Sequence, residues 1–139
     1  MPKAGELIHA YDVIRVAGVQ EASDASAVST TETVVSTISF PAIIGNIYEL
    51  RFNMKLLQSV ASDHFLFTLR EDNLAGTLID QWILPVAPAA SNGYMVIYQL
   101  DWTAASTTTK TIVGTLVRSS GTGTCTRLAK ANYQIYRES

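Results

Sequence analysis

Strict alternation of apolar and polar side chains in residues 47–57, IYELRFNMKLL, constrains the fold of this chain more than any other feature. In an extended backbone, the apolar face would carry Tyr48, Leu50, Phe52, Met54 and Leu56. The polar face would carry Glu49, Arg51, Asn53 and Lys55. A period of two residues is that of a strand with one buried face. The segment therefore predicts a half-buried antiparallel strand.

Further strand-like segments are separated by stretches rich in Gly, Pro, Asn, Ser and Thr, and they occupy residues 33–40, 64–71, 77–84, 93–102, 110–119 and 127–137. No long stretch has the i, i+3, i+4, i+7 apolar spacing of an amphipathic helix. These features predict an all-β fold, a single antiparallel β-sandwich of about eight to ten strands. Residues 1–20 would form an N-terminal arm with a first strand, and residues 21–139 the sandwich. We expect residues 33–40 and 47–57 to pair as neighbours, with Val34 and Ser36 on the same face as Phe40.

The charge and cysteine content exclude several classes of protein. Ten Lys and Arg residues against twelve Asp and Glu leave no basic footprint for nucleic acid and no polybasic membrane anchor. No apolar run approaches the roughly 20 residues that a membrane-spanning helix needs. The single cysteine, Cys125, cannot form an internal disulfide, and we expect it to be a small buried or half-buried thiol. We therefore expect a soluble protein that binds neither nucleic acid nor membrane.

Residues able to carry catalysis are scarce. The two histidines, His9 and His64, cannot supply a metal site built from several histidines. His64 follows Asp63, but no GxSxG nucleophile motif accompanies that pair. The acidic cluster of Glu71, Asp72 and Asp80 lacks the alternating oxygen ligands of an EF-hand loop. We expect no enzymatic activity, no cofactor and no metal, and a hydrolase on this fold is the weakest alternative.

A charge-poor region is the best candidate for a subunit interface. Charged residues make up 16% of the chain, against about 25% in a typical soluble domain. Between Gln81 and Thr109 the one charged residue is Asp101. Residues 77–84 and 93–102 carry apolar side chains on both faces, as central strands buried on both sides do. The predicted interface residues are Ile79, Ile83, Met95 and Ile97. Alternatively, a loop or flanking strand of the same chain covers them.

The N-terminal arm, PKAGELIHAYDVIR at residues 2–15, is polar but contains large apolar side chains. Leu7, Tyr11 and Ile14 would share one face of a helical turn. If the arm were extended, Ile8, Ala10 and Asp12 would share a face instead. Burial of three such side chains is worth several kcal/mol before ordering entropy is subtracted. We predict that the arm docks onto a partner through Leu7, Ile8, Tyr11 and Ile14. The alternative is that it caps its own sandwich.

Aromatic residues suggest a different function, because sugar-binding modules stack pyranose rings on Trp or Tyr. Trp102, beside Asp101 near the end of a predicted strand, is the candidate glycan contact. The alternative function is therefore a carbohydrate-binding module for attachment to a host cell surface. Most of the aromatic residues alternate onto predicted core faces, which favours packing over sugar binding.

Three segments carry a resemblance to a known group of proteins. The opening PKAGELIHAYDVIR, the strand GTLVRSS and the closing NYQIYRES resemble small virion proteins of tailed bacteriophages that infect actinobacteria. The resemblance implies a single jelly-roll domain without a catalytic motif, often trimeric, on the capsid exterior or among minor tail and fibre components. It implies synthesis in the host cytoplasm and contacts with other virion proteins, either the major capsid or tail proteins. On this basis we expect a homotrimeric, non-enzymatic structural protein of the virion exterior.

Overall fold

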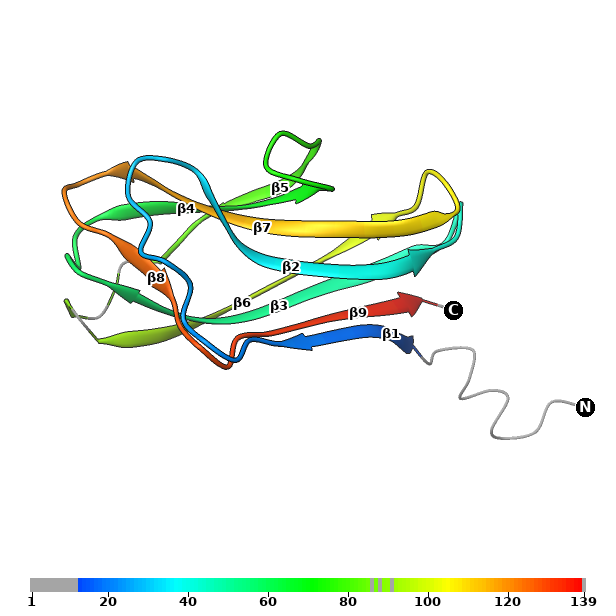
Figure 1. The fold of residues 1–139 in the computed structure, drawn as a ribbon, viewed down its shortest axis with the longest axis horizontal. Helices are drawn as coiled ribbons and strands as arrows, with labels where there is room; N and C mark the ends of the chain where they lie inside the picture. Colours follow the sequence, from blue (N-terminus) through cyan, green and yellow to red (C-terminus); the bar gives the residue numbers. More distant parts are fainter. Residues whose placement is uncertain (1–12, 86, 88, 91, 139) are drawn as a thin grey trace, which may run out of the picture.

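The computed structural model describes residues 13–85, 87, 89, 90 and 92–138, which form nine strands packed as two sheets (Figure 1). The strands are β1 (Val13–Gln20), β2 (Thr33–Ala42), β3 (Ile47–Gln58), β4 (His64–Glu71), β5 (Leu78–Ile83), β6 (Gly93–Thr103), β7 (Thr108–Ser120), β8 (Cys125–Arg127) and β9 (Asn132–Glu138). No helix long and apolar enough to cross a membrane occurs in this part of the chain. The predicted all-β sandwich is confirmed.

The strand order is that of a jelly roll. Sheet A has the order β1-β9-β3-β6, with the short β8 also on β3, and sheet B has the order β2-β7-β4-β5. Every pair of neighbouring strands is antiparallel. The expected pairing of residues 33–40 with residues 47–57 is wrong, because the turn after β2 carries the chain from sheet B to sheet A. β2 pairs with β7, while β3 pairs with β6, β8 and β9.

The core fills the space between the two inner faces. The alternation in β3 is confirmed, since its apolar face is fully buried, namely Tyr48, Leu50, Phe52, Met54 and Leu56. Phe52 packs its ring 5.0 Å from that of Tyr133 on β9 and 6.1 Å from that of Phe67 on β4. The contact with Phe67 joins the two sheets, because β3 belongs to sheet A and β4 to sheet B. Cys125 is buried at the start of β8, as expected.

Three edge strands each contain a register shift. β1, β2 and β5 have one residue more than their partners at Val16, Val35 and Ile79 respectively. A bulge of this kind reverses which residues face the core. The predicted face of β2 is therefore wrong at its start: Val34 is exposed, whereas Val35 and Ser36 are both buried.

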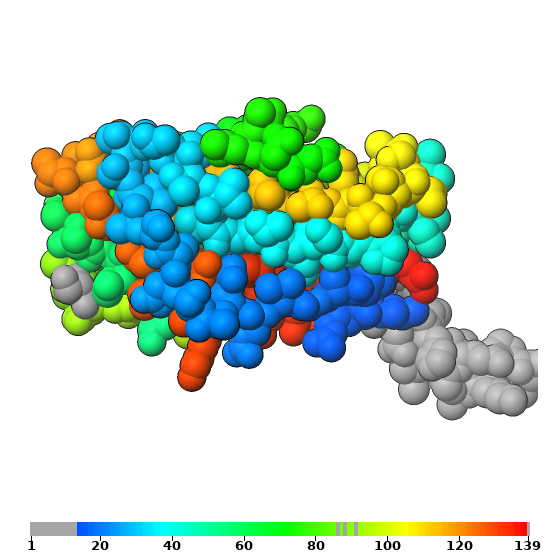
Figure 2. All heavy atoms as spheres, in the orientation of Figure 1, coloured from blue at the N-terminus to red at the C-terminus, as the bar shows by residue number. Residues whose placement is uncertain are grey.

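A buried arginine closes the side of the sandwich where β1 and β2 lie. Arg127 donates hydrogen bonds from Nε to the carbonyl oxygen of Val35 at 2.9 Å and from Nη1 to that of Ser23 at 2.6 Å. Its Nη2 lies 3.1 Å from a carboxylate oxygen of Glu21. The chain between β1 and β2, blue in Figure 2, is thus fixed across this side.

Candidate assembly surface

The opposite side of the sandwich, formed by β5 and β6, is its open edge. β5 ends sheet B and β6 ends sheet A. Between these strands the rings of Trp82 and Tyr98 stack with centroids 4.6 Å apart. Outside that stack, Ile83 is 70% exposed, Met95 is 68% exposed and Ile97 is 62% exposed. We call these three side chains and their two strands the β5–β6 edge.

The fourth predicted interface residue, Ile79, does not belong to this edge. The bulge in β5 places Ile79 partly buried against the core. The interpretation of residues 77–84 and 93–102 as central strands covered on both faces is wrong, because β5 and β6 are the last strands of their sheets. Among the described residues, no segment covers Ile83, Met95 or Ile97.

A second exposed apolar group lies in the turn between β2 and β3 and at the first residue of β3. Ile43, Ile44 and Ile47 are 45%, 62% and 41% exposed. The sequence analysis did not single them out, although two adjacent isoleucines in the turn segment PAIIGN are a visible signal. Of the predicted docking arm, Ile14 is exposed on β1. Its other residues, Leu7, Ile8 and Tyr11, lie outside the described residues.

Carboxylates gather on the outer face of sheet A, where β6 ends. Asp101 on β6 pairs in register with Glu49 on β3. Partial desolvation, together with the charges of Asp101 and Glu49, raises the pKa of Glu138 on β9. Arg51 donates a 2.6 Å hydrogen bond to Glu49 and leaves the other two carboxylates without a described cation. We call Glu49, Asp101 and Glu138 the acidic corner.

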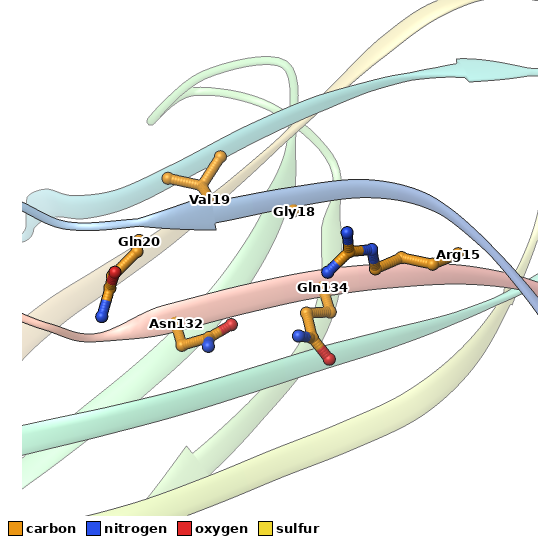
Figure 3. A pocket seen from close by; sticks show the side chains of 6 residues that line it. All are labelled: Arg15, Gly18, Val19, Gln20, Asn132 and Gln134. Atoms are coloured by element: carbon orange, nitrogen blue, oxygen red, sulfur yellow. The ribbon is translucent and has the colours of Figure 1, made fainter.

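A shallow open depression of about 250 Å³ lies at the other side of sheet A, between β1 and β9. Its lining residues are Arg15, Gly18, Val19, Gln20, Asn132 and Gln134 (Figure 3). The polar groups are one guanidinium and three side-chain amides, which bind ligands by hydrogen bonds and do not transfer protons near neutral pH. The depression therefore offers binding groups but no general acid or base.

The candidate glycan contacts point to opposite faces of β6. Trp102 is half-buried and packs its ring 5.9 Å from that of Phe40 and 6.2 Å from that of Tyr48. Asp101 is exposed on the outer face of sheet A. A sugar stacked on Trp102 would have to displace core packing, so the structure does not bring these two residues together as one site.

The candidate catalytic residues are likewise separated. Asp63 is buried and accepts hydrogen bonds from the backbone N–H groups of Thr122 and Gly123, which fixes one loop against another. His64, the next residue, is exposed at the start of β4. Burial raises the pKa of Cys125 to about 12, so its thiol is protonated at neutral pH.

Two of the three carboxylates considered for calcium, Glu71 and Asp72, form ion pairs with a lysine. Lys110 Nζ lies 2.7 Å from Glu71 and 3.3 Å from Asp72. Within the described ranges, no group of three or more His, Cys, Asp or Glu residues could hold a metal ion.

Comparison with known proteins supports the fold. No family model matches the chain, and no curated relative matches it. The structure of the Eiger TNF from S. frugiperda matches with a TM-score of 0.58 at 9% identity, over 91% of this chain and 93% of that one. The VP2 subviral particle of infectious bursal disease virus matches with a TM-score of 0.55 at 10% identity, over 91% of this chain. Our chain spans about a third of the VP2 chain, 33%. At these identities the likenesses define a jelly-roll sandwich of a kind found in a viral particle protein.

Proposed function

We propose that this protein is a non-enzymatic structural protein of a bacteriophage particle, a homotrimer on the virion exterior that acts as a capsid decoration or minor tail or fibre protein. The observation that carries the proposal is the β5–β6 edge, where three large apolar side chains are each more than 60% exposed. Met95 and Ile97 alternate with the inward Tyr98 and point out of sheet A, whereas Ile83 alternates with the inward Trp82 and points out of sheet B. A partner along the edge would therefore cover exposed apolar side chains on both outer faces, and exposed apolar surface of this kind marks contact sites.

The jelly-roll fold supports this role through its likeness to VP2 of a viral particle. The resemblance of the N-terminal and C-terminal segments to phage virion proteins supports the assignment to a phage, although no match at the level of sequence was found. A trimer is a closed ring with a heterologous contact, in which one surface of a copy meets a different surface of the next. The β5–β6 edge would be one of those two surfaces.

The protein would act by binding alone. A copy that contacts two neighbouring capsid or tail subunits binds the assembled particle more tightly than it binds the separate subunits. Its binding free energy therefore stabilises the assembled particle. Each copy would thus stabilise the particle in proportion to its occupancy.

Two measurements test the proposal. Light scattering on the purified full chain should give the mass of a trimer, and antibodies against the chain should label the surface of intact particles of its phage in electron micrographs. A chain that stays monomeric at high concentration contradicts the assembly. A chain made in infected cells but missing from purified particles contradicts the role in the virion.

A further inference from the structure

β6 differs from the other three edge strands because it has no bulge and carries a single charged side chain, Asp101. β1, β2 and β5 each contain a bulge, and β5 is only six residues long. β6 has eleven residues paired with β3 without a register shift, and it contains no Pro, Lys or Arg. Among the described residues, β3 is the one strand hydrogen-bonded to it. Long, regular and weakly charged edges pair with further strands, and natural proteins guard against this with bulges, prolines and charges.

We propose that the N-terminal arm of a second copy, residues 3–11, adds to β6 as a further, antiparallel strand of sheet A. The register places Lys3 opposite Asp101 and Leu7 opposite Ile97. This inference rests on the proposed assembly of copies and names the segment that covers the edge. Backbone hydrogen bonds would provide affinity, and the alternate side chains would provide register.

Charge selects the orientation of the arm. In the antiparallel register, Lys3 lies opposite Asp101, which is the carboxylate of the acidic corner on β6 itself; Glu49 and Glu138 follow on the next two strands of the sheet. A parallel arm would bring the end that carries Asp12 to the same corner. Like charges on neighbouring strands are destabilising, whereas opposite charges stabilise the pair.

Side-chain size selects the same register. Leu7 would lie directly opposite Ile97 and diagonal to Met95, and would cover the two most exposed apolar side chains of β6. Tyr11 would lie opposite Gly93, where an aromatic ring can cover the backbone of the glycine. Eleven residues of β6 thus accommodate the nine residues of the arm with their apolar side chains aligned.

The geometry requires that the arm come from another copy. The pairing registers place Val13 at the end of sheet A where β6 finishes at Thr103. Tyr11 opposite Gly93 would lie at the other end of β6, roughly 33 Å away along the strand. The two residues from Tyr11 to Val13 span at most about 7 Å. Even a parallel arm would have to cross four strand spacings, about 19 Å, to reach its own β1.

An arm given to the next copy and received from the previous one is a heterologous contact. Such contacts close into a ring when the rotation between copies permits, which agrees with the proposed trimer. The arm and the β5–β6 edge would then be the two different surfaces that this contact requires.

A cysteine pair tests the register. Leu7→Cys chains are co-expressed with affinity-tagged Ile97→Cys chains, oxidised, captured by the tag and separated without reductant. Directly opposed residues on paired strands are close enough for a disulfide. Cys125 is fully buried, so the native thiol does not compete. The matched control is tagged Ile44→Cys, because Ile44 and Ile97 are equally exposed at 62%.

A disulfide-linked pair of tagged and untagged chains is expected with Ile97→Cys and is expected to be lost with Ile44→Cys. Equal cross-linking in both mixtures, or none in either, overturns the proposed register. Amide hydrogen exchange gives a second readout that does not depend on new cysteines. In the full chain, the amides of residues 93–103 that do not bond to β3 should exchange slowly, and deletion of residues 2–11 should abolish that protection.

The outcomes also separate this inference from the proposed function. If the chain lacking residues 2–11 keeps the oligomer and the slow exchange in β6, while Ile97→Asp dissociates it, another surface of the neighbour covers the edge. That result overturns the arm exchange and leaves the assembly intact. A full chain that is monomeric at every concentration contradicts both.

Discussion

Replacement of Ile97 by Asp should dissociate the oligomer without unfolding the monomer. Complete burial of an isoleucine side chain is worth about 1.5–3 kcal/mol. Ile97 is 62% exposed, so burial of this exposed part in an interface contributes about 1–2 kcal/mol per copy. An unpaired carboxylate in that position adds a desolvation cost of several kcal/mol. Together these terms exceed about 4 kcal/mol, which corresponds to a roughly thousandfold weaker contact.

The monomer should tolerate the change, because the side chain points away from the core. Substitutions at exposed positions away from special features usually change the free energy of unfolding by about 0.5 kcal/mol or less. Urea unfolding of Ile97→Asp should therefore give a single transition close to that of the parent monomer. Sedimentation velocity over a dilution series, from high to sub-micromolar concentration, measures the dissociation constant directly.

Ile44→Asp is the matched control, since it places the same charge on an equally exposed isoleucine in the turn between β2 and β3. We expect it to leave the dissociation constant within a factor of a few of the parent. If Ile97→Asp assembles as tightly as the parent, the edge does not form the contact. If Ile44→Asp dissociates the oligomer instead, the contact lies at the isoleucine turn.

Three further changes test the interior and the ion pairs. Tyr98→Phe should raise the free energy of unfolding, measured by urea unfolding, by about 1 kcal/mol, because the buried hydroxyl has no hydrogen-bond partner among the described residues. A loss of stability would show that the hydroxyl has a partner. Gly114→Ala should cost about 1–3 kcal/mol, since a Cβ there would lie 2.6 Å from Phe67 Cζ; unchanged stability would contradict this packing. A hydrogen bond from Arg70 lowers the pKa of Glu32, so Glu32→Gln should be less stable than the parent at pH 7. That difference, measured by urea unfolding, should be lost as the pH falls below 4.5 through the lowered pKa; a constant difference would show that charge is not its cause.

Most strands could be predicted from the sequence because their signal is local. The single closing strand expected at residues 127–137 is wrong, because residues 128–131 separate β8 from β9. β3 is recognisable from alternation alone, since each residue faces either the core or the solvent for its whole length. The absence of clustered histidines was also readable from the sequence, because it depends only on which residues the chain contains.

Pairing and edge position could not be predicted, because they depend on how the chain crosses between sheets. β2 and β3 are separated by a short turn that suits a hairpin, yet they lie in different sheets. β5 and β6 resemble buried central strands because they are apolar on both faces. A strand has the same sequence pattern whether its apolar outer face is buried by a segment of the same chain or by another molecule.

Bulges further limit how well the sequence predicts which side chains of a strand face the core. One extra residue in β5 separates Ile79 from Ile83, although the two positions have the same parity in the sequence. Neither this bulge nor the one in β2 occurs at a glycine, and neither has a residue pattern that would reveal it. A predicted face is therefore reliable only between bulges, and only the structure shows where they are.

The distribution of bulges is itself informative about assembly. A free strand edge attracts other strands regardless of sequence, so an edge that stays solvent-exposed needs a protective feature. Three edges of this sandwich have a register shift, and the fourth, β6, has none over eleven residues. If β6 were exposed in the working protein, chains would be expected to aggregate through it. A regular β6 without protection is instead what a strand needs in order to receive a partner in a defined register, since a bulge would interrupt the ladder.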